Sequence, residues 1–376
     1  MPNNKPAVIG VGYAKRALTP GTREHERLCA NAVMFKEHHL VVFTRVHEGF
    51  PAEQHIGNFH IYATNARTRV GMIVRAGAIA RDLLRQAPTE HFVLSAQDPL
   101  YTSAALLPLI GRPNTSFHVQ LHGDYFSPYH LGRSFMGWVK RHFALYVLRL
   151  ASGIRVVSER IKHSLIEKGI PAELITVLPI QADLEKFLAV GARRNYETTP
   201  APVFLYVGRF SEEKNVSLLL KAFAVGKRRG LSGTLRLLGE GALRHRLKHE
   251  TAALGLSHDV TFLPWTNDVP AVMAAADVLV LSSDHEGYAM VLKEGMAAGL
   301  PIVTTDVGCA GEVVVSGIHG LVVPVRNEAF FATALLTISE YAPLREEFGR
   351  AGYEKAKASL MPDEEYLLAI QNSYSI

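Results

Sequence analysis

Two glutamates, Glu286 and Glu294, lie in the segment SSDHEGYAMVLKEGMAAGLPIVTTDVG with seven residues between them. The run DVLVLSS before them is typical of a buried strand, and AMVLKEGMAAG is typical of a helix that ends near Gly299. Backbone amides at the start of such a helix attract anions, and carboxylates accept hydrogen bonds from sugar hydroxyls. The segment therefore predicts a site for an anionic ligand rich in hydroxyls. The alternative is that Glu286 caps the helix and Glu294 faces solvent.

A second segment, YVGRFSEEKNVSLLLKAF, places two cations at a turn from a strand to a helix. Gly208 and Arg209 follow the strand, and Lys214 precedes a helix expected to begin near Asn215. Arginine can bind a phosphate through two parallel hydrogen bonds, and lysine can bind one as a point charge. We therefore predict a clamp for two linked phosphates, with a pair of solvated surface cations as the alternative.

Metal binding is a competing interpretation of the acidic segment. Asp284, His285 and Glu286 resemble a triplet that holds a divalent metal in another class of sugar-nucleotide enzymes. Two acids alone do not make a metal cage. His118 and His122 share a strand face, but no third ligand follows at a recognisable spacing, so zinc is not expected. We predict no metal site.

In the first half, SFHVQLHGDYF places His122 and Asp124 at the end of a strand. This position makes His122 a candidate for the presumed ligand cleft, although a structural histidine is the alternative. In TPGTREHE, Gly21 lies in a loop before a helix whose N-cap would be Thr22; its amide could approach a phosphate, and a plain helix start is the alternative. GVGYAK lacks the third glycine of a dinucleotide fingerprint, and no G-x-x-x-x-G-K-[ST] motif occurs, which argues against a P-loop NTPase.

Both halves of the chain alternate apolar strands with helices. The strands expected in the first half are AVIGVGYA, HHLVVFTR, EHFVLSA, SFHVQLHG and GIRVVS, and those in the second are VFLYVGR, TLRLLGEG, VTFLP, VLVLSS, PIVTT and GLVVPV. Such alternation predicts α/β domains with parallel sheets covered on both faces. GARRNYETTPAP between the halves is polar and patternless and is interpreted as a linker. We expect two doubly wound domains that face each other across a cleft.

Composition limits the class of protein. The chain has 376 residues, 48% hydrophobic and 20% charged, which is ordinary for a globular protein of two domains. It has two cysteines, no apolar run long enough to span a membrane and no secretion signal at its start, so a cytoplasmic location is expected. A formal charge of +5 mildly favours anionic partners.

The segment LGRSFMGWVKRHFALYVLRL mixes aromatic with basic residues, including Arg133, Trp138 and Lys140. Arg133 and Lys140 would share a helical face, so an anionic membrane surface is a candidate partner. The alternative is a core helix with a solvated basic side.

Taken together, these segments resemble the GT-B glycosyltransferases, in particular family 4, whose retaining enzymes use nucleotide sugars. The resemblance is strong over residues 203 to 325, and the paired glutamates fit the E-x7-E signature of the family. It implies a GT-B fold, an acceptor domain at 1–188, a linker at 189–202, a nucleotide-sugar domain at 203–359, and a C-terminal helix at 360–376 that packs back on the first domain.

The resemblance also implies site roles. Arg209 and Lys214 would hold the diphosphate of a UDP- or GDP-linked sugar, Glu294 the ribose, and Glu286 the transferred hexose. His122 would lie near the reacting carbon, with Asp124 on the acceptor side. Further donor contacts are expected from Gly21, Gly208, Gly239, Leu263, Pro264, Gly287, Tyr288, Ala289, Met290 and Val291. The N-terminal loop of the family usually carries more glycines than Pro20-Gly21-Thr22 does.

The function implied is transfer of a hexose-type sugar to a glycan or lipid-linked acceptor, as in synthesis of cell-envelope polysaccharide or glycolipid, without cofactor, metal or nucleic acid. An epimerase of the same fold and an inactive nucleotide-sugar-binding protein are the alternatives. Incubation with nucleotide sugars would distinguish the three: transfer to an acceptor indicates the transferase, a changed sugar the epimerase, and binding alone the inactive protein.

Overall fold

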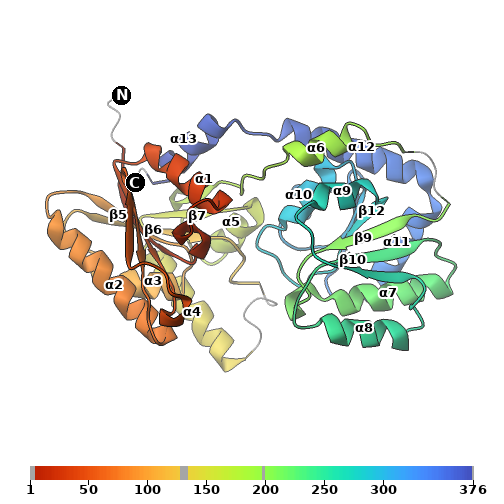
Figure 1. Ribbon diagram of the computed structural model, residues 1–376, viewed down its shortest axis with the longest axis horizontal. Coiled ribbons are helices and arrows are strands. Elements are labelled where there is room, and N and C mark those ends of the chain that lie inside the picture. Colours follow the sequence, from red (N-terminus) through yellow and green to blue (C-terminus); the bar gives the residue numbers. More distant parts are fainter. Residues whose placement is uncertain (1–4, 128–133, 197–199, 375–376) are drawn as a thin grey trace. The chain divides into compact units, whose positions relative to one another are not determined.

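The computed structural model describes residues 5–127, 134–196 and 200–374, which form two compact units (Figure 1). Unit 1 comprises Met1–Pro179 and Met361–Ile376, and unit 2 comprises Ile180–Leu360. Each unit is built on a largely parallel sheet with helices on both faces, which confirms the predicted α/β class. Within the described ranges, no helix is both long and apolar enough to cross a membrane.

The sheet of unit 1 has the strand order β3-β4-β2-β1-β5-β6-β7-β8, and every neighbouring pair is parallel except β3 with β4. Its strands are β1 (Ala7–Gly12), β2 (Glu37–Val42), β3 (Glu53–Ile56), β4 (Phe59–Ala63), β5 (Phe92–Ala96), β6 (Thr115–Leu121), β7 (Gly153–Val156) and β8 (Ile175–Val177). The winding direction reverses between β1 and β5, so the carboxyl ends of these two strands flank a switch point.

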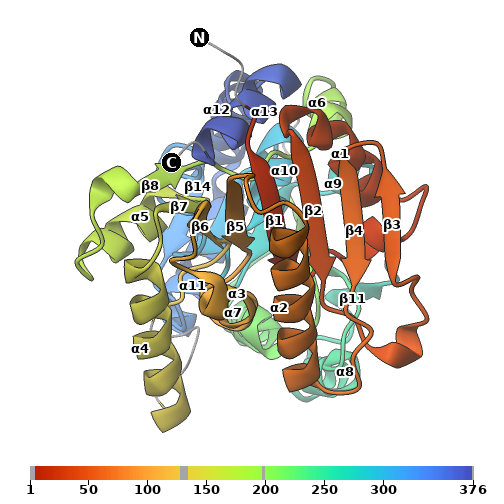
Figure 2. The ribbon, with the colours of Figure 1, turned by 90° about the vertical axis from the view of Figure 1, so that its left-hand side faces the viewer.

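Helices cover both faces of this sheet (Figure 2). They are α1 (Arg23–Asn31), α2 (Arg69–Gln86), α3 (Tyr101–Leu106), α4 (Phe135–Arg149), α5 (Glu159–Ile166) and α13 (Asp363–Ser373). A hydroxyl side chain accepts a hydrogen bond from the first turn at the starts of α1, α2, α4 and α5; these N-caps are Thr22, Thr68, Ser134 and Ser158. Such caps satisfy backbone amides that have no partner inside the helix. The predicted N-cap at Thr22 is confirmed.

The sheet of unit 2 has the order β11-β10-β9-β12-β13-β14, and all of its strands are parallel. The strands are β9 (Val203–Val207), β10 (Thr234–Leu238), β11 (Val260–Leu263), β12 (Val278–Leu281), β13 (Ile302–Thr305) and β14 (Gly320–Val323). Strands β12 and β13 are buried along their whole length, and in line with this burial β12 is entirely apolar and β13 consists of Ile, Val and two Thr residues. This is the doubly wound order, with the switch point between β9 and β12.

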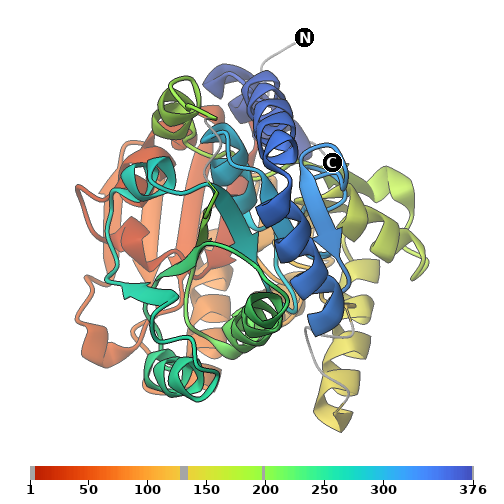
Figure 3. The ribbon, with the colours of Figure 1, turned by 90° about the vertical axis from the view of Figure 1, so that its right-hand side faces the viewer.

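The helices of unit 2 form two layers. Helices α7 (Val216–Arg228) and α11 (Glu328–Glu340) pack together, with α8 (Arg244–Ala253) against α7. The second layer contains α6 (Glu185–Gly191), α9 (Val269–Ala274), α10 (Met290–Ala297) and α12 (Ala342–Ala358). Figure 3 shows the long α12, drawn in blue, in front of the strands of this unit.

Three strands were not predicted. Strands β3 and β4 form a hairpin joined by Gly57 and Asn58, and Gly57 has a φ of 59°. A two-residue loop with glycine first is a recognised hairpin signal, so this hairpin could have been predicted from the sequence. The third strand, β8, has only three residues, which is too short for a periodic pattern.

The segment interpreted as a linker differs from that prediction. Arg194 donates three hydrogen bonds, from Nε to the carbonyl oxygen of Ala298 at 2.6 Å, from Nη1 to that of Ala276 at 2.7 Å and from Nη2 to that of Met273 at 2.7 Å. A single guanidinium thereby satisfies carbonyls at the carboxyl ends of α9 and α10. The segment is anchored to unit 2, which begins at Ile180 and not after residue 188.

Candidate functional site

The two predicted binding segments meet at the switch point of unit 2. Gly208 and Arg209 directly follow β9, and the segment 282–289 connects β12 to α10. Strands β9 and β12 are neighbours in the sheet. In doubly wound sheets, ligands bind at the carboxyl ends of the strands beside the switch point.

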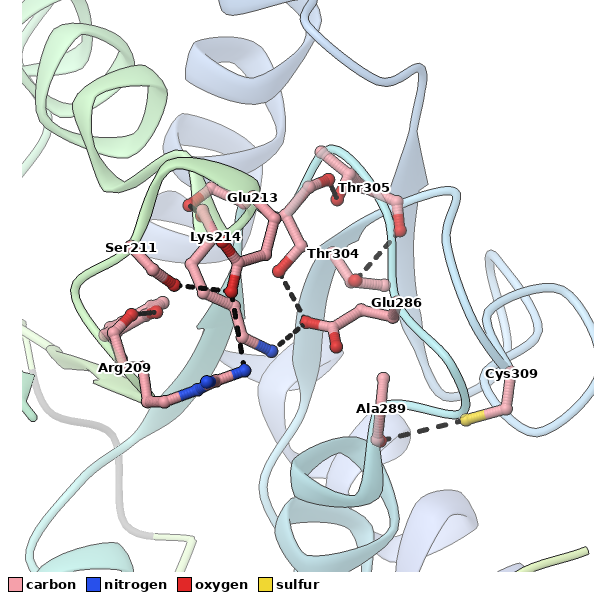
Figure 4. Close-up of polar contacts among 12 residues, drawn as sticks. Arg209, Ser211, Glu213, Lys214, Glu286, Ala289, Thr304, Thr305 and Cys309 are labelled. Carbon is pink, nitrogen blue, oxygen red and sulfur yellow. Dashed lines mark hydrogen bonds and ion pairs between the residues drawn. The ribbon is translucent and has the colours of Figure 1, made fainter. Parts of the chain in front are cut away.

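Lys214 and Glu286 form a buried ion pair at this point (Figure 4). Lys214 Nζ lies 2.5 Å from Glu286 Oε1, and their side chains are 17% and 10% exposed. Ser283 Oγ donates a second hydrogen bond to the same carboxylate oxygen at 2.6 Å. Glu286 therefore faces a cation and does not cap the helix.

Arg209 behaves differently from Lys214. Its backbone carbonyl accepts a hydrogen bond from the Tyr206 hydroxyl at 3.0 Å, which fixes the turn after β9. Its side chain is 78% exposed and reaches Glu213 at 3.4 Å. An exposed ion pair at that distance is weak, so the Arg209 guanidinium is available to a phosphate.

The loop before α7 positions the Lys214 side chain toward Glu286. Asn215 has a φ of 41° and caps α7, while its Nδ2 donates to Asp284 Oδ1 at 2.7 Å. Ser282 Oγ donates to the carbonyl oxygen of Lys214 at 3.1 Å, and the Asp284 amide donates to that of Glu213 at 2.8 Å. The loops after β9 and β12 are thus bound to each other on both sides of the ion pair.

Asp284 connects the loop that contains Arg326 to the loops after β9 and β12. Its Oδ2 accepts hydrogen bonds from Nε and Nη2 of Arg326 at 2.8 and 2.6 Å. Both carboxylate oxygens are therefore engaged, one by Asn215 and one by Arg326. This engagement argues against the interpretation in which Asp284 and Glu286 bind a divalent metal together.

The start of α10 lies beside Glu286. Ala289 precedes the helix with φ 63° and ψ 61°, and no side chain caps the first turn. The carbonyl oxygen of Tyr288 accepts from the Cys309 amide at 3.1 Å, which holds this left-handed turn. A Cβ at Gly308 would come within 3.0 Å of the Glu286 Cβ, so the absence of a side chain there leaves room for the glutamate. The turn offers a helix N-terminus to an anion.

Glu294 lies in the second turn of α10. Its side chain is half-buried, and burial raises its pKa above the ordinary value. Among the residues that the structure describes, no hydrogen-bond or ion-pair partner contacts its carboxylate. A partly desolvated carboxylate is stabilised by hydrogen-bond donors, and the hydroxyls of a ligand would supply them.

The predicted contacts for the base lie at the ends of β10 and β11. A Cβ at Gly239 would be 1.9 Å from the carbonyl oxygen of Gly208, so the two strand ends can approach only because residue 239 is glycine. Arg244 Nη1 donates to the carbonyl oxygen of Gly239 at 2.7 Å and lies 3.5 Å from that of Leu263. Pro264 follows the last residue of β11.

Three predicted residues lie in unit 1. Gly21 is exposed in the loop before α1 with a φ of 79°. His122 directly follows β6, and its side chain is exposed. Partial desolvation and the Arg155 guanidinium lower the pKa of His122, so its imidazole is neutral at pH 7.

Asp124 has a different environment from the one predicted. Its Oδ1 accepts hydrogen bonds from the amides of Phe126 and Ser127 at 2.9 and 3.1 Å and from Ser164 Oγ at 3.3 Å. These contacts make Asp124 the anchor of the turn after β6, because a short carboxylate can bind the backbone two and three residues later. The structure thus gives Oδ1 a structural role, and acceptor binding by Asp124 stays a prediction.

Several residues that shape the site were not predicted. Ser283 and Asn215 lie within the quoted motifs, so their hydroxyl and amide groups could have been considered. Arg326 lies 42 residues beyond Asp284, and no local pattern connects the two. Cys309, whose thiol pKa burial raises to about 12, packs against the same turn as a neutral side chain.

Comparison with known proteins identifies the family. The family described as Glycosyl transferases group 1 matches residues 192–355, and Glycosyltransferase Family 4 matches residues 27–186. The lipopolysaccharide core biosynthesis glycosyltransferase LpsE of Rhizobium meliloti is 36% identical over 155 residues, which are 41% of this chain and 44% of LpsE. The chain spans less than two thirds of the length of the curated relatives that it matches first.

Solved structures share the fold over nearly the whole chain. Sucrose-phosphate synthase from Thermosynechococcus elongatus has a TM-score of 0.77 at 18% identity, with 98% of both chains covered. Anabaena HepE in complex with UDP and glucose has a TM-score of 0.69 at 18% identity, again with 98% of both chains covered. With the family matches covering both halves and the E-x7-E glutamates at the switch point, the chain belongs to the family 4 glycosyltransferases of the GT-B fold.

Proposed function

We propose that this protein is a retaining glycosyltransferase that moves a hexose-type sugar from a UDP- or GDP-linked donor to a hydroxyl of a glycan or lipid-linked acceptor. The observation that carries the proposal is the convergence of Lys214 and Glu286 at the switch point of unit 2. The complex of HepE with UDP and glucose supports a donor of this class, and the name of LpsE supports a cell-envelope acceptor.

The proposed donor lies across the start of α10. Arg209 and Lys214 bind its diphosphate, because one guanidinium is exposed and one ammonium is aimed at the switch point. Glu294 accepts hydrogen bonds from the ribose hydroxyls, which would satisfy its partnerless carboxylate. Glu286 contacts the transferred sugar. Backbone around this turn completes the donor site, contributed by Gly208, Gly287, Tyr288, Ala289, Met290 and Val291, with the base near Gly239, Leu263 and Pro264.

The chemistry follows from where charge develops. When the bond between the anomeric carbon and the phosphate oxygen breaks, negative charge grows on the departing diphosphate. Two cations and a helix N-terminus stabilise that charge without a metal, and of the two cations Lys214 is held in place before the reaction by its contact with Glu286. The acceptor hydroxyl attacks from the same face of the sugar, and its proton passes to the departing phosphate. Neutral His122 positions or polarises the acceptor in this scheme.

Two other functions use the same donor. An epimerase would isomerise the nucleotide sugar, and an inactive protein would only bind it. The presence of Arg209, Lys214, Glu286 and Glu294 together favours transfer, because each of these residues has a separate role in stabilising donor or leaving group.

A membrane partner is supported by the surface of α4. Phe135, Met136 and Trp138 are 78%, 58% and 51% exposed at the start of this helix, and Tyr146 is 56% exposed further along it. Lys140 lies on the same helix with its ammonium 5.9 Å from the Tyr101 ring, whereas Arg133 lies outside the described residues. Exposed aromatic and basic residues of this kind suit the interface of an anionic membrane, which would keep the enzyme peripheral on the cytoplasmic face.

The test is a transfer assay with labelled UDP- and GDP-hexoses and a lipid extract, run with and without EDTA. We expect labelled acceptor in both conditions. Isomerised donor would support the epimerase, and donor binding without either product would support the inactive protein. Loss of transfer with EDTA and recovery with manganese would refute the metal-free scheme.

A further inference from the structure

A concentration of positive charge borders one end of the sheet in unit 1. The segments that follow β1, β2 and β4, residues 13–18, 44–50 and 64–75, contain six lysine or arginine residues and one acidic residue, Glu48. We call the six cations the basic rim: Lys15, Arg16, Arg45, Arg67, Arg69 and Arg75. Figure 2 shows β1, β2 and β4 side by side with α2 beside them. All three strands run parallel, so the rim lies at the carboxyl ends of the strands, on one side of the sheet.

Hydrogen bonds attach two members of the rim to the loop after β4. Arg45 Nη1 donates to the carbonyl oxygen of Arg67 at 2.8 Å, and Arg75 Nη1 donates to that of Asn65 at 2.9 Å. Five of the six side chains are exposed, and Arg45 is half-buried. These contacts hold two of the guanidinium groups over the loop after β4 and leave their other N–H groups to a ligand.

The single acid does not neutralise the rim. Glu48 accepts from Lys15 Nζ at 2.5 Å and from the Arg45 amide at 2.6 Å. The backbone hydrogen bond from Arg45 and then the contact with Lys15 lower the pKa of Glu48, so it is ionised at neutral pH. One carboxylate against six cations leaves a strong excess of positive charge.

Two of the rim cations lie at the N-terminus of α2, where the helix dipole makes positive charge unfavourable. Arg67 and Arg69 flank Thr68, the N-cap of α2, and the first turn of this helix contains no acidic residue. The N-terminus of a helix carries partial positive charge, so acids are the residues that stabilise it. Among the described residues, the side chains of Arg67 and Arg69 contact no carboxylate. An anion bound at the rim would relieve the repulsion among these groups.

We propose that the acceptor carries a phosphate or carboxylate group that binds to the basic rim. This inference rests on the proposed transferase function and specifies its acceptor as an anionic glycan. The carboxyl edge of a parallel sheet is where such folds bind ligands, and arginine matches phosphate and carboxylate through paired hydrogen bonds. Val46 and Val70, 56% and 69% exposed beside the cations, would contact the sugar rings.

The test uses glucose 6-phosphate as the anionic probe, glucose as its neutral counterpart and UDP as the donor probe, each measured by calorimetric titration at low salt. We expect glucose 6-phosphate to bind at least tenfold more tightly than glucose. The double variant Arg67→Glu/Arg69→Glu should weaken binding of glucose 6-phosphate at least tenfold and leave the Kd for UDP unchanged. The matched control is Arg81→Glu/Arg85→Glu, which makes the same change of charge further along α2 and should bind both probes as the wild type does.

The outcomes separate the two proposals. If the wild-type protein binds neither UDP nor GDP in the same titration, the transferase proposal is refuted, whatever happens at the rim. Equal binding of glucose 6-phosphate to wild type and to Arg67→Glu/Arg69→Glu would refute the anionic acceptor. A rim variant that loses only its affinity for phosphatidylglycerol vesicles would also overturn it, because the rim would then contact a membrane.

Discussion

Removing one member of the Lys214–Glu286 pair should destabilise unit 2 more than removing both. The two charged atoms lie 2.5 Å apart in side chains that are at most 17% exposed. With an effective dielectric constant near 20, their attraction is about 7 kcal/mol before desolvation is counted. Breaking a buried pair leaves one charge without compensation, which costs about 3 to 5 kcal/mol, whereas replacing both partners is often nearly neutral.

The variants are Lys214→Met, Glu286→Gln and the double variant, examined by urea unfolding. We expect Lys214→Met to lose about 3 kcal/mol of stability, because Glu286 would keep only its hydrogen bond from Ser283. Glu286→Gln should lose less, and the double variant should recover most of the loss. Lys221→Met is the control, since Lys221 is 50% exposed and lies 3.8 Å from its partner Glu250, where at most about 1 kcal/mol is expected.

The same variants also separate binding from chemistry. Lys214→Met should weaken UDP binding by about 2 kcal/mol, the scale of a charge-assisted hydrogen bond. Glu286→Gln should lower kcat more than it raises KM, because in our proposal Glu286 contacts the sugar that is transferred. Glu294→Gln should mainly weaken donor binding, because the ribose changes little during transfer. An unchanged kcat in folded Glu286→Gln, or three variants as stable as the control, would refute this reasoning.

Three further predictions test other features. Burial and then Arg155 lower the pKa of His118 to about 3, below the roughly 6.5 of an unfolded histidine, so unit 1 should lose about 3 kcal/mol of stability from this residue between pH 7 and 4.5. The stability of unit 1, measured by hydrogen exchange, should fall less between pH 7 and 4.5 in His118→Phe than in the wild type. The same pH dependence in both proteins would exclude His118 as the cause of the fall. Ala289→Gly should raise the melting temperature of unit 2, because a left-handed alanine costs about 1 kcal/mol; a lower value would show that the methyl group is needed. Trp138→Ala/Phe135→Ala should reduce co-sedimentation with anionic vesicles, and unchanged sedimentation would point to a soluble acceptor.

The alternating strands and helices of both units could be predicted, because each is indicated by a short local pattern of the sequence. Parallel strands such as β9 and β12 consist of short apolar runs, and helices such as α1, α2 and α7 carry their own N-caps. The site segments could also be located, because Arg209, Lys214 and Glu286 lie where strands end. A strand end is visible in the sequence, and the switch-point rule turns it into a binding position.

The contacts that organise the site could not be predicted, since they join residues far apart in the chain. Lys214 and Glu286 are 72 residues apart, and nothing in either motif shows that one neutralises the other. The left-handed conformation of Ala289 is hidden for a related reason, because alanine gives no sign of it and only the packing of the turn against the Cys309 loop imposes it. Asp124 makes a further contact that the sequence did not predict, because its motif does not show that one carboxylate oxygen would bind the amides of the adjacent turn.

The two glutamates of the E-x7-E pair differ in what the protein itself supplies to them. Glu286 already has a cation and a hydroxyl, so its carboxylate is oriented before any ligand arrives. Glu294 lacks a partner among the described residues, and burial raises its pKa, so its free energy improves when a ligand brings hydrogen-bond donors. A preorganised charge suits the step in which charge moves, and an unsatisfied acceptor suits recognition of hydroxyls. The different environments therefore support the roles that the family motif implies, and our proposal keeps Glu286 for the transferred sugar and Glu294 for the ribose.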